Sequence, residues 1–235
     1  MSSLKTIVLK FSGPLQSWGT TAHFETRHTD FYPSKSAIIG LLAASLGYRR
    51  EETDKIVQLN ELSFGVRIDQ KGELLKDYHT ARKYKADGAF ERTYVTERYY
   101  LQDAVFLVAL SSAEDQLIDQ ISYALANPYF QPFMGRRSLP LPMDFIVGIY
   151  DSGLIEILQK LPWQAAKWYQ KKHSALLDAF VDADLVQDKQ AQLRKDRVLS
   201  FNQKNRQFAY RKEAQFYIDL RSANEQTAHD PFAYL

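Results

Sequence analysis

The chain has 235 residues, 45% of them hydrophobic, and can therefore bury one substantial core, or one core with a smaller satellite. It contains no cysteine, which excludes disulfides, zinc–thiolate sites and thiol nucleophiles and fits a reducing cytoplasm. The net charge of +2 does not by itself indicate a nucleic-acid-binding protein. The apolar stretch near the N-terminus is short and interrupted by lysines, so we expect a soluble cytoplasmic protein with no signal peptide and no membrane span.

Strand and helix patterns alternate in the N-terminal part of the chain. Residues 4–11 have the period-two alternation of a strand with one face on a core. Apolar residues at helical spacing follow, and we expect this helix to be capped by Ser34 or Ser36 and to end at Gly47. A second, short helix is predicted over residues 51–60.

Two strand patterns flank a polar insertion. Residues 64–69 alternate as a strand, and residues 104–110 (AVFLVAL) are typical of a buried strand. Between them, residues 76–98 are polar, aromatic and basic, which predicts a solvent-facing hairpin that projects from the core. Exposed tyrosines cost solubility unless they contact a partner, so we expect this hairpin to meet RNA or a neighbouring protein.

A second long helix and a fourth strand complete the pattern. Ser112 and Asp115 have capping-box spacing and predict a helix that stops at the Asn-Pro pair, residues 127–128. Residues 145–149 then alternate as a strand. The element order is β-α-β-β-α-β, the ferredoxin-like arrangement that many RNA-recognition domains share, although this topology also hosts unrelated functions.

We therefore predict an α+β protein with two parts. Residues 1–150 form a ferredoxin-like, RRM-like domain with a projecting thumb insertion at about residues 76–101. Residues 151–235 form a small C-terminal β-rich region. Within that region, residues 175–181 are either strand or helix, and residues 215–220 are a strand.

The C-terminal region carries a strongly basic tract. Residues 178–188 are acidic, whereas residues 189–212 contain eight basic residues and one acid, Asp196. Aromatic residues interleaved with these cations suit single-stranded nucleic acid, whose bases stack while its phosphates pair. A solvated basic face or a disordered arm is the alternative. The basic residues are Lys189, Arg194, Lys195, Arg197, Lys204, Arg206, Arg211 and Lys212, and the aromatic residues are Phe201, Phe208, Tyr210, Phe216 and Tyr217.

The turn after the first strand and the start of the first helix are two candidate contact points. Gln16 and Trp18 follow a Gly-Pro turn and can present an amide and an indole beside the sheet; the alternative is a tight turn with the tryptophan packed on the core. Lys35 lies at a helix N-terminus, where free N–H groups favour a phosphate, although ordinary capping explains the flanking serines equally well. The Walker loop pattern is missing, so nucleotide hydrolysis is disfavoured.

The insertion contains residues suited to RNA binding and residues suited to catalysis. Tyr78, His79, Arg82 and Arg98 are candidate RNA contacts. His79 can also act as a general acid or base, together with Tyr78 and Lys83, in metal-independent cleavage of RNA. In neither case do we expect a metal or a cofactor.

The segment from 127 to 140, NPYFQPFMGRRSLP, combines prolines, aromatic residues and arginines. Prolines stiffen the chain around Gly135, where the backbone could approach a ligand closely. Arg136 and Arg137 supply planar donors for phosphates. The alternative is a structural loop whose arginines pair with acids such as Asp144.

Six motifs together resemble a known family. They are GPLQSWG, RHTDFYPSKSAIIGLLAASLG, KDYHT, YLQDAVF, PFMGRRSLPL and RQFAYR, they occur in the family's order, and they span most of the chain. In these motifs the chain is similar to the CasD family of the type I-E CRISPR Cascade complex, within CRISPR-associated family five.

The resemblance implies a non-catalytic subunit that holds the 5′ handle of the CRISPR RNA and caps one end of the backbone filament. It implies CRISPR RNA and the backbone and large subunits as partners, with target DNA as a further candidate, and neither a membrane nor a small-molecule substrate. Residues 78–100 would be a thumb that packs against the neighbouring backbone subunit and crosses the guide. The residues that we expect to contact RNA are Gln16, Trp18, Arg27, Lys35, Tyr78, His79, Arg82, Arg98, Gly135, Arg136, Arg137, Arg206 and Arg211.

A related branch, the type I-C members, provides the rival interpretation. Those proteins cleave the repeat RNA with tyrosine, lysine and histidine side chains, and Tyr78, Lys83 and His79 supply these residue types here. The motifs of this chain are closer to the type I-E branch, in which a separate subunit cuts the repeat. We therefore expect binding rather than catalysis.

Overall fold

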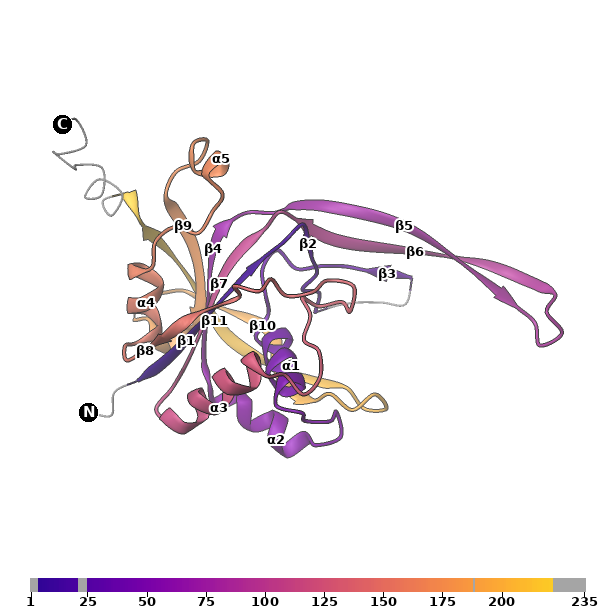
Figure 1. Ribbon diagram of the computed structural model, residues 1–235, viewed down its shortest axis with the longest axis horizontal. Coiled ribbons are helices and arrows are strands. Elements are labelled where there is room, and N and C mark those ends of the chain that lie inside the picture. Colours follow the sequence, from indigo (N-terminus) through magenta and orange to yellow (C-terminus); the bar gives the residue numbers. More distant parts are fainter. Residues whose placement is uncertain (1–3, 21–24, 188, 222–235) are drawn as a thin grey trace.

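The structure is a computed structural model that describes residues 4–20, 25–187 and 189–221. A seven-stranded antiparallel sheet in the order β10-β11-β9-β4-β7-β1-β8 forms its centre, and β2, β3, β5 and β6 form a smaller sheet (Figure 1). The helices are α1 (Lys35–Ser45), α2 (Thr53–Gln58), α3 (Asp115–Ala126), α4 (Leu154–Lys160) and α5 (Lys167–Gln170), with 3₁₀ turns at Leu59–Glu61 and Ala183–Leu185. The strands are β1 (Lys5–Ser12), β2 (Leu15–Gln16), β3 (Thr26–Arg27), β4 (Ser63–Gln70), β5 (Glu73–Tyr84), β6 (Phe90–Gln102), β7 (Val105–Ser112), β8 (Ile146–Tyr150), β9 (Leu176–Asp182), β10 (Ala191–Ser200) and β11 (Gln207–Asp219). Across the described ranges, no helix is long and apolar enough to cross a membrane.

Four strands and two helices form the ferredoxin-like part. β4, β7, β1 and β8 are neighbours in that order, so the second, third, first and fourth strands of the predicted pattern lie side by side. Ile7, Leu9 and Phe11 of β1 pack in one core with Ile38 of α1 and Ile118 of α3, and these helices therefore cover one face of the sheet. The predicted fold class is confirmed.

The first helix begins and ends where its sequence signals predict. Ser34, one of the two expected caps, is the N-cap of α1, and its hydroxyl accepts a hydrogen bond from the N–H of Ala37 at 3.3 Å. Gly47 follows the helix with a φ of +79°, in the left-handed region that favours glycine.

The expected capping box at the second long helix is wrong. Ser112 is the last residue of β7, where it pairs with Lys5 of β1, and it therefore cannot serve as the N-cap. Glu114 is the N-cap of α3 and makes no side-chain capping bond. The Ser112 hydroxyl accepts a hydrogen bond from the N–H of Glu114 at 2.9 Å and so stabilises the turn that precedes the helix.

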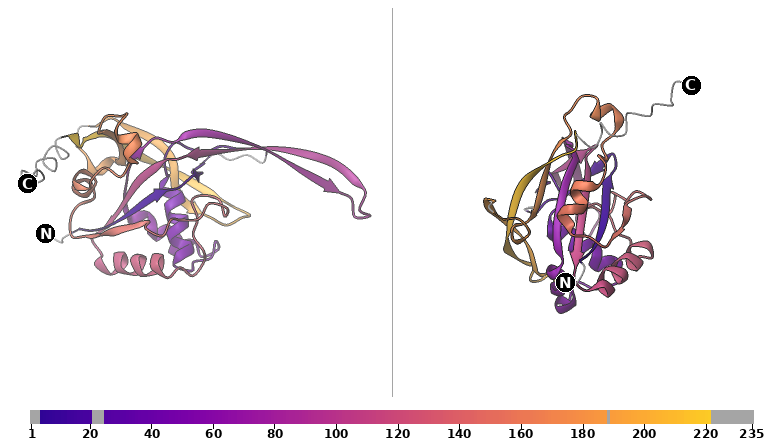
Figure 2. Two further views of the ribbon diagram at one scale, coloured as in Figure 1. Left: turned by 45° about the horizontal axis from the view of Figure 1, so that its top comes forward. Right: turned by 90° about the vertical axis from the view of Figure 1, so that its left-hand side faces the viewer.

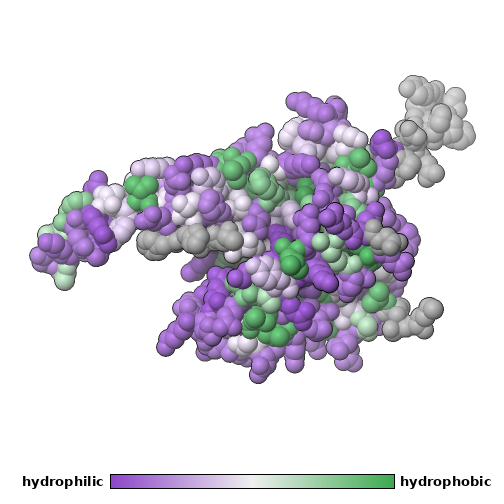
Figure 3. Space-filling model, turned by 180° about the vertical axis from the view of Figure 1, so that it is seen from behind, coloured by the Kyte–Doolittle hydropathy of each residue, from purple (hydrophilic) through white to green (hydrophobic). Residues whose placement is uncertain are grey.

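The insertion forms a long hairpin of β5 and β6 that projects from the core (Figures 1 and 2). Its root also pairs with β2 and, in parallel, with β3, so the root is anchored while the distal part is exposed. Hydrophobic side chains on the projecting arm are scattered among hydrophilic ones (Figure 3). The predicted projecting hairpin is confirmed, and we call it the thumb.

The C-terminal strands continue the large sheet. β9 pairs with β4, β11 pairs with β9, and β10 pairs with β11 at one edge of the sheet. The segment 175–181, predicted as strand or helix, forms a strand from residue 176, and the predicted strand at 215–220 belongs to β11 up to residue 219. The two predicted parts of the chain therefore share one sheet, and their division at residue 150 as folding units stays a prediction.

A buried ion pair lies on the second face of this sheet. Arg67 and Asp69 of β4 are 0% and 1% exposed, and Arg67 donates to the two carboxylate oxygens of Asp69 at 2.7 and 2.8 Å. Burial raises the pKa of Asp69, and the hydrogen bond and charge of Arg67 oppose that shift. Main-chain carbonyls of Leu158, Leu161 and Pro162 accept the other guanidinium hydrogens. The alternation in β4 therefore separates two buried faces, because the C-terminal part covers the polar one.

Candidate nucleic-acid interface

Segments that are far apart in the sequence meet at the root of the thumb. β3 lies beside β6 with Arg27 opposite Arg98. From the loop after α3, Arg136 donates through Nη2 to the carbonyl oxygens of Arg27 and Tyr99, both at 3.0 Å. Its guanidinium also lies 4.1 Å from the ring centre of Tyr100. The loop, β3 and the thumb are thereby held together.

Gly135 allows this loop to pass against the turn after β1. Its φ is +84°, and a Cβ added there would lie 1.6 Å from the carbonyl oxygen of Ser17. The N–H of Ser17 donates to the carbonyl oxygen of Met134 at 3.2 Å. Both conformation and space therefore require glycine. The close approach expected at Gly135 is made to the protein's own main chain.

Gln16 and Trp18 support the interface from within the core. They are 0% and 1% exposed, and the Trp18 ring packs edge-on against Phe11. Gln16 donates to the carbonyl oxygens of Phe11 at 3.3 Å and Ala104 at 2.7 Å, and it accepts from the indole N–H of Trp18 at 3.0 Å. With these bonds made internally, the packed alternative describes both residues, and neither presents its polar atoms to a ligand.

The thumb root presents an arginine cluster, which we define as Arg27, Arg98, Arg136 and Arg137. Arg27 and Arg137 are exposed. The Nε of Arg98 and the Nη1 of Arg136 are buried atoms with no hydrogen-bond partner among the described residues. Asp144, the alternative partner for the loop arginines, pairs with Lys10 instead. A buried donor without a partner costs about 1–3 kcal/mol, so an acceptor supplied by a ligand would be favourable here.

The strand register separates the three residues considered for catalysis. Successive residues of a strand point to opposite faces, so His79 shares a face with Arg98 whereas Tyr78 points to the other. Lys83 lies four residues beyond His79, about 13 Å along the strand, and it pairs with Glu91 at 2.9 Å. The three side chains therefore do not converge on one point.

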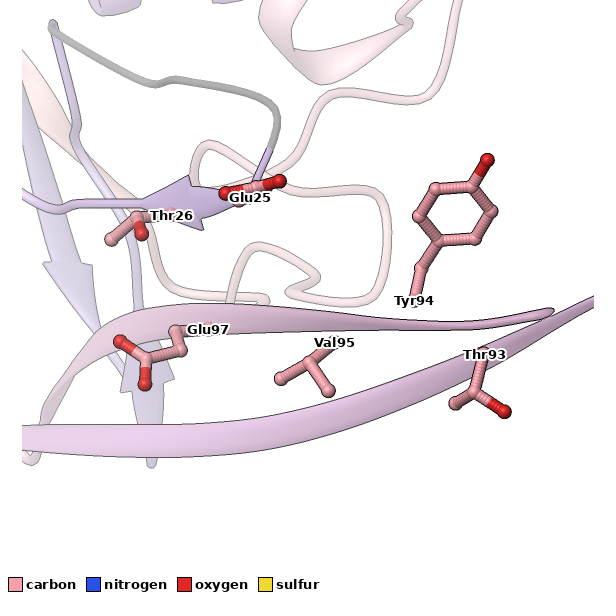
Figure 4. A pocket seen from close by; sticks show the side chains of 6 residues that line it. All are labelled: Glu25, Thr26, Thr93, Tyr94, Val95 and Glu97. Carbon is pink, nitrogen blue, oxygen red and sulfur yellow. The ribbon is translucent and has the colours of Figure 1, made fainter.

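Tyr78 and Arg82 lie on the opposite face of the thumb from Arg98. A shallow hollow lies between β3 and β6, and side chains that point to both sides of the thumb line it (Figure 4). Two carboxylates, those of Glu25 and Glu97, lie at it. The hydrogen bond from Lys76 lowers the pKa of Glu97 and keeps that group charged. An acidic hollow is unsuited to a phosphate. The hollow, about 380 Å³ in volume, is lined by Glu25, Thr26, Thr93, Tyr94, Val95 and Glu97.

A carboxylate of the protein occupies the N-terminus of α1. The N–H of Lys35 donates to Asp196 at 2.9 Å, and its ammonium pairs with Asp182 at 3.1 Å. Burial lowers the pKa of Lys35, and Asp182 opposes the shift. The phosphate expected at this helix start is replaced by Asp196, and the structure does not bring Lys35 to the arginine cluster.

The two C-terminal candidates lie in different surroundings. Arg211 is 8% exposed and pairs with Asp182 and Asp196, both at 2.9 Å, and with Glu213 at 2.6 Å. Burial alone would lower the pKa of Arg211, but the hydrogen bond to Asp196 and the charges of Asp196, Glu213 and Asp182 together raise it. Its donors are therefore directed at the protein. Arg206, in contrast, is exposed at the turn between β10 and β11.

Sequence reasoning missed two residues at the thumb root. The His28 ring stacks on Tyr99 with a centroid distance of 5.2 Å, and Lys76 lies 5.9 Å from the centre of the same ring. His28 directly follows Arg27, and this adjacency was the available signal. Within the part of the chain that the structure describes, no group of three His, Cys, Asp or Glu residues could hold a metal ion.

The fold and the site define a ferredoxin-like α+β protein with a projecting thumb and an arginine cluster at its root. The family model described as CRISPR-associated protein (Cas_Cas5) matches residues 6–227. The chain therefore belongs to this family of CRISPR-associated proteins.

Individual relatives agree with this assignment. The CRISPR system Cascade subunit CasD of Escherichia coli (strain K12) is 35% identical over 156 residues, which cover 60% of this chain and 70% of that protein. A chain of a solved CRISPR RNA-guided surveillance complex is 31% identical, with a TM-score of 0.73 over 91% of this chain and 90% of that chain. A crystal structure of a Cas protein is 30% identical, with a TM-score of 0.66 over 91% of this chain and 95% of that chain.

Proposed function

We propose that this protein is a Cascade subunit that binds CRISPR RNA at the arginine cluster. The observation that carries the proposal is the geometry of Arg136. Two main-chain carbonyls and the Tyr100 ring hold its guanidinium in place, while Nη1 has no partner among the described residues. A guanidinium fixed in this way loses little entropy when it pairs with a phosphate. The similarity to CasD, itself a Cascade subunit, supports the same role.

The 5′ handle is the part of the RNA that we assign to this cluster. In the family that the motifs resemble, the loop after the second long helix contacts the handle, and that loop here carries Gly135, Arg136 and Arg137. Arg27 and Arg98 add two further cations from β3 and β6. Gln16 and Trp18 act indirectly, by holding the turn on which the loop packs.

We assign the distal thumb to contacts with a neighbouring backbone subunit and with the guide that crosses it. Its tip exposes Tyr84 and Phe90, at 54% and 56%, and its side exposes Tyr78 at 63%. Aromatic side chains at these exposures are typical of contact residues. The large subunit, and target DNA, are further partners of the complex that we propose, and we place the complex in the cytoplasm.

We further propose that the protein does not cut RNA. A general base and its helper residues must lie within hydrogen-bond reach of one reacting group. His79 and Tyr78 point to opposite faces of the thumb, and Lys83 is displaced along the strand and paired with Glu91. This separation favours a binding role over the type I-C alternative.

The binding proposal is tested by reversing two charges of the cluster. Arg136→Glu with Arg137→Glu is expected to weaken binding of a labelled handle RNA by at least tenfold and to reduce its dependence on salt, because fewer counterions are released. Fluorescence anisotropy at several salt concentrations measures both effects. Lys171→Glu with Lys172→Glu, at two exposed lysines far along the chain, is the matched control. Equal affinity of the two double variants would refute the proposal.

Cleavage is tested separately with labelled repeat RNA in EDTA at high protein concentration. We expect the RNA to stay intact, and His79→Ala to behave like the unmodified chain. Cutting that depends on His79 would establish the endoribonuclease instead.

A further inference from the structure

The basic tract at 189–212 is divided by the fold into an inner and an outer set. Arg194 and Arg211 are opposite each other in the pairing of β10 with β11, and both turn inward. Arg194 pairs with Asp30 at 3.0 Å, and its guanidinium lies 4.2 Å from the ring centre of Tyr32. Asp196, the single acid of the tract, is 0% exposed and bonded to Arg211. The inner arginines and the acid therefore neutralise each other inside the protein.

The outer set faces solvent without a compensating acid of its own. Lys189, Lys195, Arg197, Lys204, Arg206 and Lys212 are all exposed. Arg197 pairs with Glu61 at 3.3 Å, and the other five have no ion-pair partner among the described residues. Because Asp196 is buried, the hairpin itself exposes cations and no acid of the tract, and Glu61 compensates only Arg197.

Aromatic rings lie among these outer cations. Tyr210 is 61% exposed, and the ammonium of Lys195 lies 5.9 Å from the centre of its ring. At the tip, the Arg206 guanidinium lies 5.2 Å from the ring centre of Phe208 and 5.9 Å from that of Phe201. Phe201 and Phe208 are half-buried against the core, whereas Tyr210 is accessible. A cation beside an accessible ring is the combination that single-stranded nucleic acid uses, because its bases stack while its phosphates pair.

A second like charge is close to the tip. Although Arg206 is exposed, partial desolvation of its guanidinium, and then the positive charge of Arg50, lower the pKa of Arg206. Arg50 is exposed, and neither guanidinium has an ion-pair partner among the described residues. Repulsion between two such groups is relieved when an anion binds near both.

We propose that the outer face of the β10–β11 hairpin is a second nucleic-acid surface, which binds the backbone of a single strand through Lys195, Lys204, Arg206 and Lys212. From Lys212 to Arg206 the strand runs about 20 Å, enough for several phosphates. The hairpin projects separately from the thumb and lies at the other end of the sheet from β8 (Figures 1 and 2). This surface is therefore distinct from the arginine cluster.

The two surfaces are linked through one loop. Asp30, which pairs with Arg194 of β10, lies three residues beyond Arg27 of the arginine cluster. The strand bound at the hairpin could thus be the continuation of the same RNA or a separate DNA strand. Both sources present the same phosphodiester chemistry.

The test uses the full chain and two double variants, Lys195→Glu with Lys212→Glu and Lys204→Glu with Arg206→Glu. We expect each to weaken binding of a labelled 30-nucleotide strand of unrelated sequence by about tenfold, and to lower the slope of log affinity against log salt by roughly 1.4 for two lost phosphate contacts. Lys171→Glu with Lys172→Glu is the control of equal charge change. Unchanged melting temperatures show that these exposed substitutions leave the fold intact.

Three probes separate the possible outcomes: a handle-only RNA, a handle RNA extended by 20 nucleotides, and a DNA strand. A loss of affinity confined to the extended RNA supports a hairpin surface that binds the guide. A loss of affinity for the DNA strand supports a hairpin surface that binds DNA. If both hairpin variants bind all three probes as tightly as the control variant does, the proposal is overturned. It is also overturned if they bind the probes normally and fail only to join other subunits. The Arg136→Glu, Arg137→Glu pair is scored with the handle-only probe, so failure of the proposed function is distinguished from failure of this one.

Discussion

At the scale of single residues, Gly135 shows how one position holds the proposed interface together. Gly135→Ala must adopt a left-handed φ and also place a methyl group against the carbonyl of Ser17. We expect it to destabilise the protein by about 3 kcal/mol or more. Gly88 has nearly the same φ, +83°, with nothing within 4 Å of an added Cβ, so Gly88→Ala should cost no more than about 1–2 kcal/mol. Urea unfolding of both variants checks this, and equal costs would mean that the contact with Ser17 is unimportant.

Arg211 and Lys212 are adjacent in β11 but have opposite surroundings. Removing the Arg211 guanidinium leaves Asp182, Asp196 and Glu213 buried together, so Arg211→Met is expected to cost about 3–5 kcal/mol. Lys212→Met, on the exposed side, should change stability by less than about 0.5 kcal/mol. Thermal and urea unfolding measure both.

The RNA affinity of the Arg211→Met variant distinguishes a structural role of Arg211 from the RNA contact that the family resemblance implies for this residue. At a temperature where Arg211→Met is folded, its affinity for handle RNA should equal that of the unmodified chain. A tenfold loss of affinity in the folded variant would restore Arg211 to the RNA-binding residues.

At the scale of elements, the thumb should be separable from the core. Residues 80–95 are exposed, except for the half-buried Tyr94. The residues that anchor the root of the thumb lie outside this range. Replacing 80–95 by an Asn-Gly turn keeps the His79–Thr96 pair and suits a two-residue hairpin loop. We expect the melting temperature to change by no more than about 2–4 °C, while copurification with the backbone subunits is lost. A shortened chain that still assembles would show that the distal thumb is not the contact.

The elements that sequence predicted correctly are those with a local signal. Periodicity places the main strands and helices, and Ser34 and Gly47 mark the bounds of α1 because caps depend on neighbouring residues. The polar interior was not predictable in this way. The carbonyls that satisfy Arg67 come from residues more than 90 positions away, and the carboxylate at the start of α1 comes from Asp196, so neither is visible in a local pattern.

The candidate interface shows the same limit. Motif positions alone grouped Gln16, Lys35 and Arg211 with Arg136, yet burial assigns the first three to internal bonds. In contrast, Arg27, Arg98 and Arg136, which the sequence analysis expects to contact RNA, are brought together by the pairing of β3 with β6 and by the loop after α3. The internal hydrogen bonds and ion pairs of each cation, which only the fold reveals, decide which of these cations keeps a donor for a ligand.

At the scale of the whole molecule, the C-terminal part should be required for the first part to fold. β9 covers the edge of β4, and the segment after β8 supplies the carbonyls that bond Arg67. It also covers the face formed by Val8, Leu107 and Ala109. Residues 1–150 alone would expose this apolar face. They would also leave the Arg67–Asp69 ion pair without the hydrogen bonds from residues 158–162. The free energy lost in this way is comparable to the stability of an ordinary domain.

We therefore expect residues 1–150 to show no cooperative thermal transition and no near-ultraviolet circular dichroism of packed aromatic rings. Coexpression of 1–150 with 151–235 is the matched control, and it should restore both signals, because the break falls in the bend after β8 and the sheet can reassemble across it. Cooperative melting of 1–150 by itself would contradict this, and would make the C-terminal part a satellite on an independent ferredoxin-like domain. The shared sheet favours the absence of cooperative melting in residues 1–150. Without β9, the four strands of this part would end in an open, partly polar edge at β4.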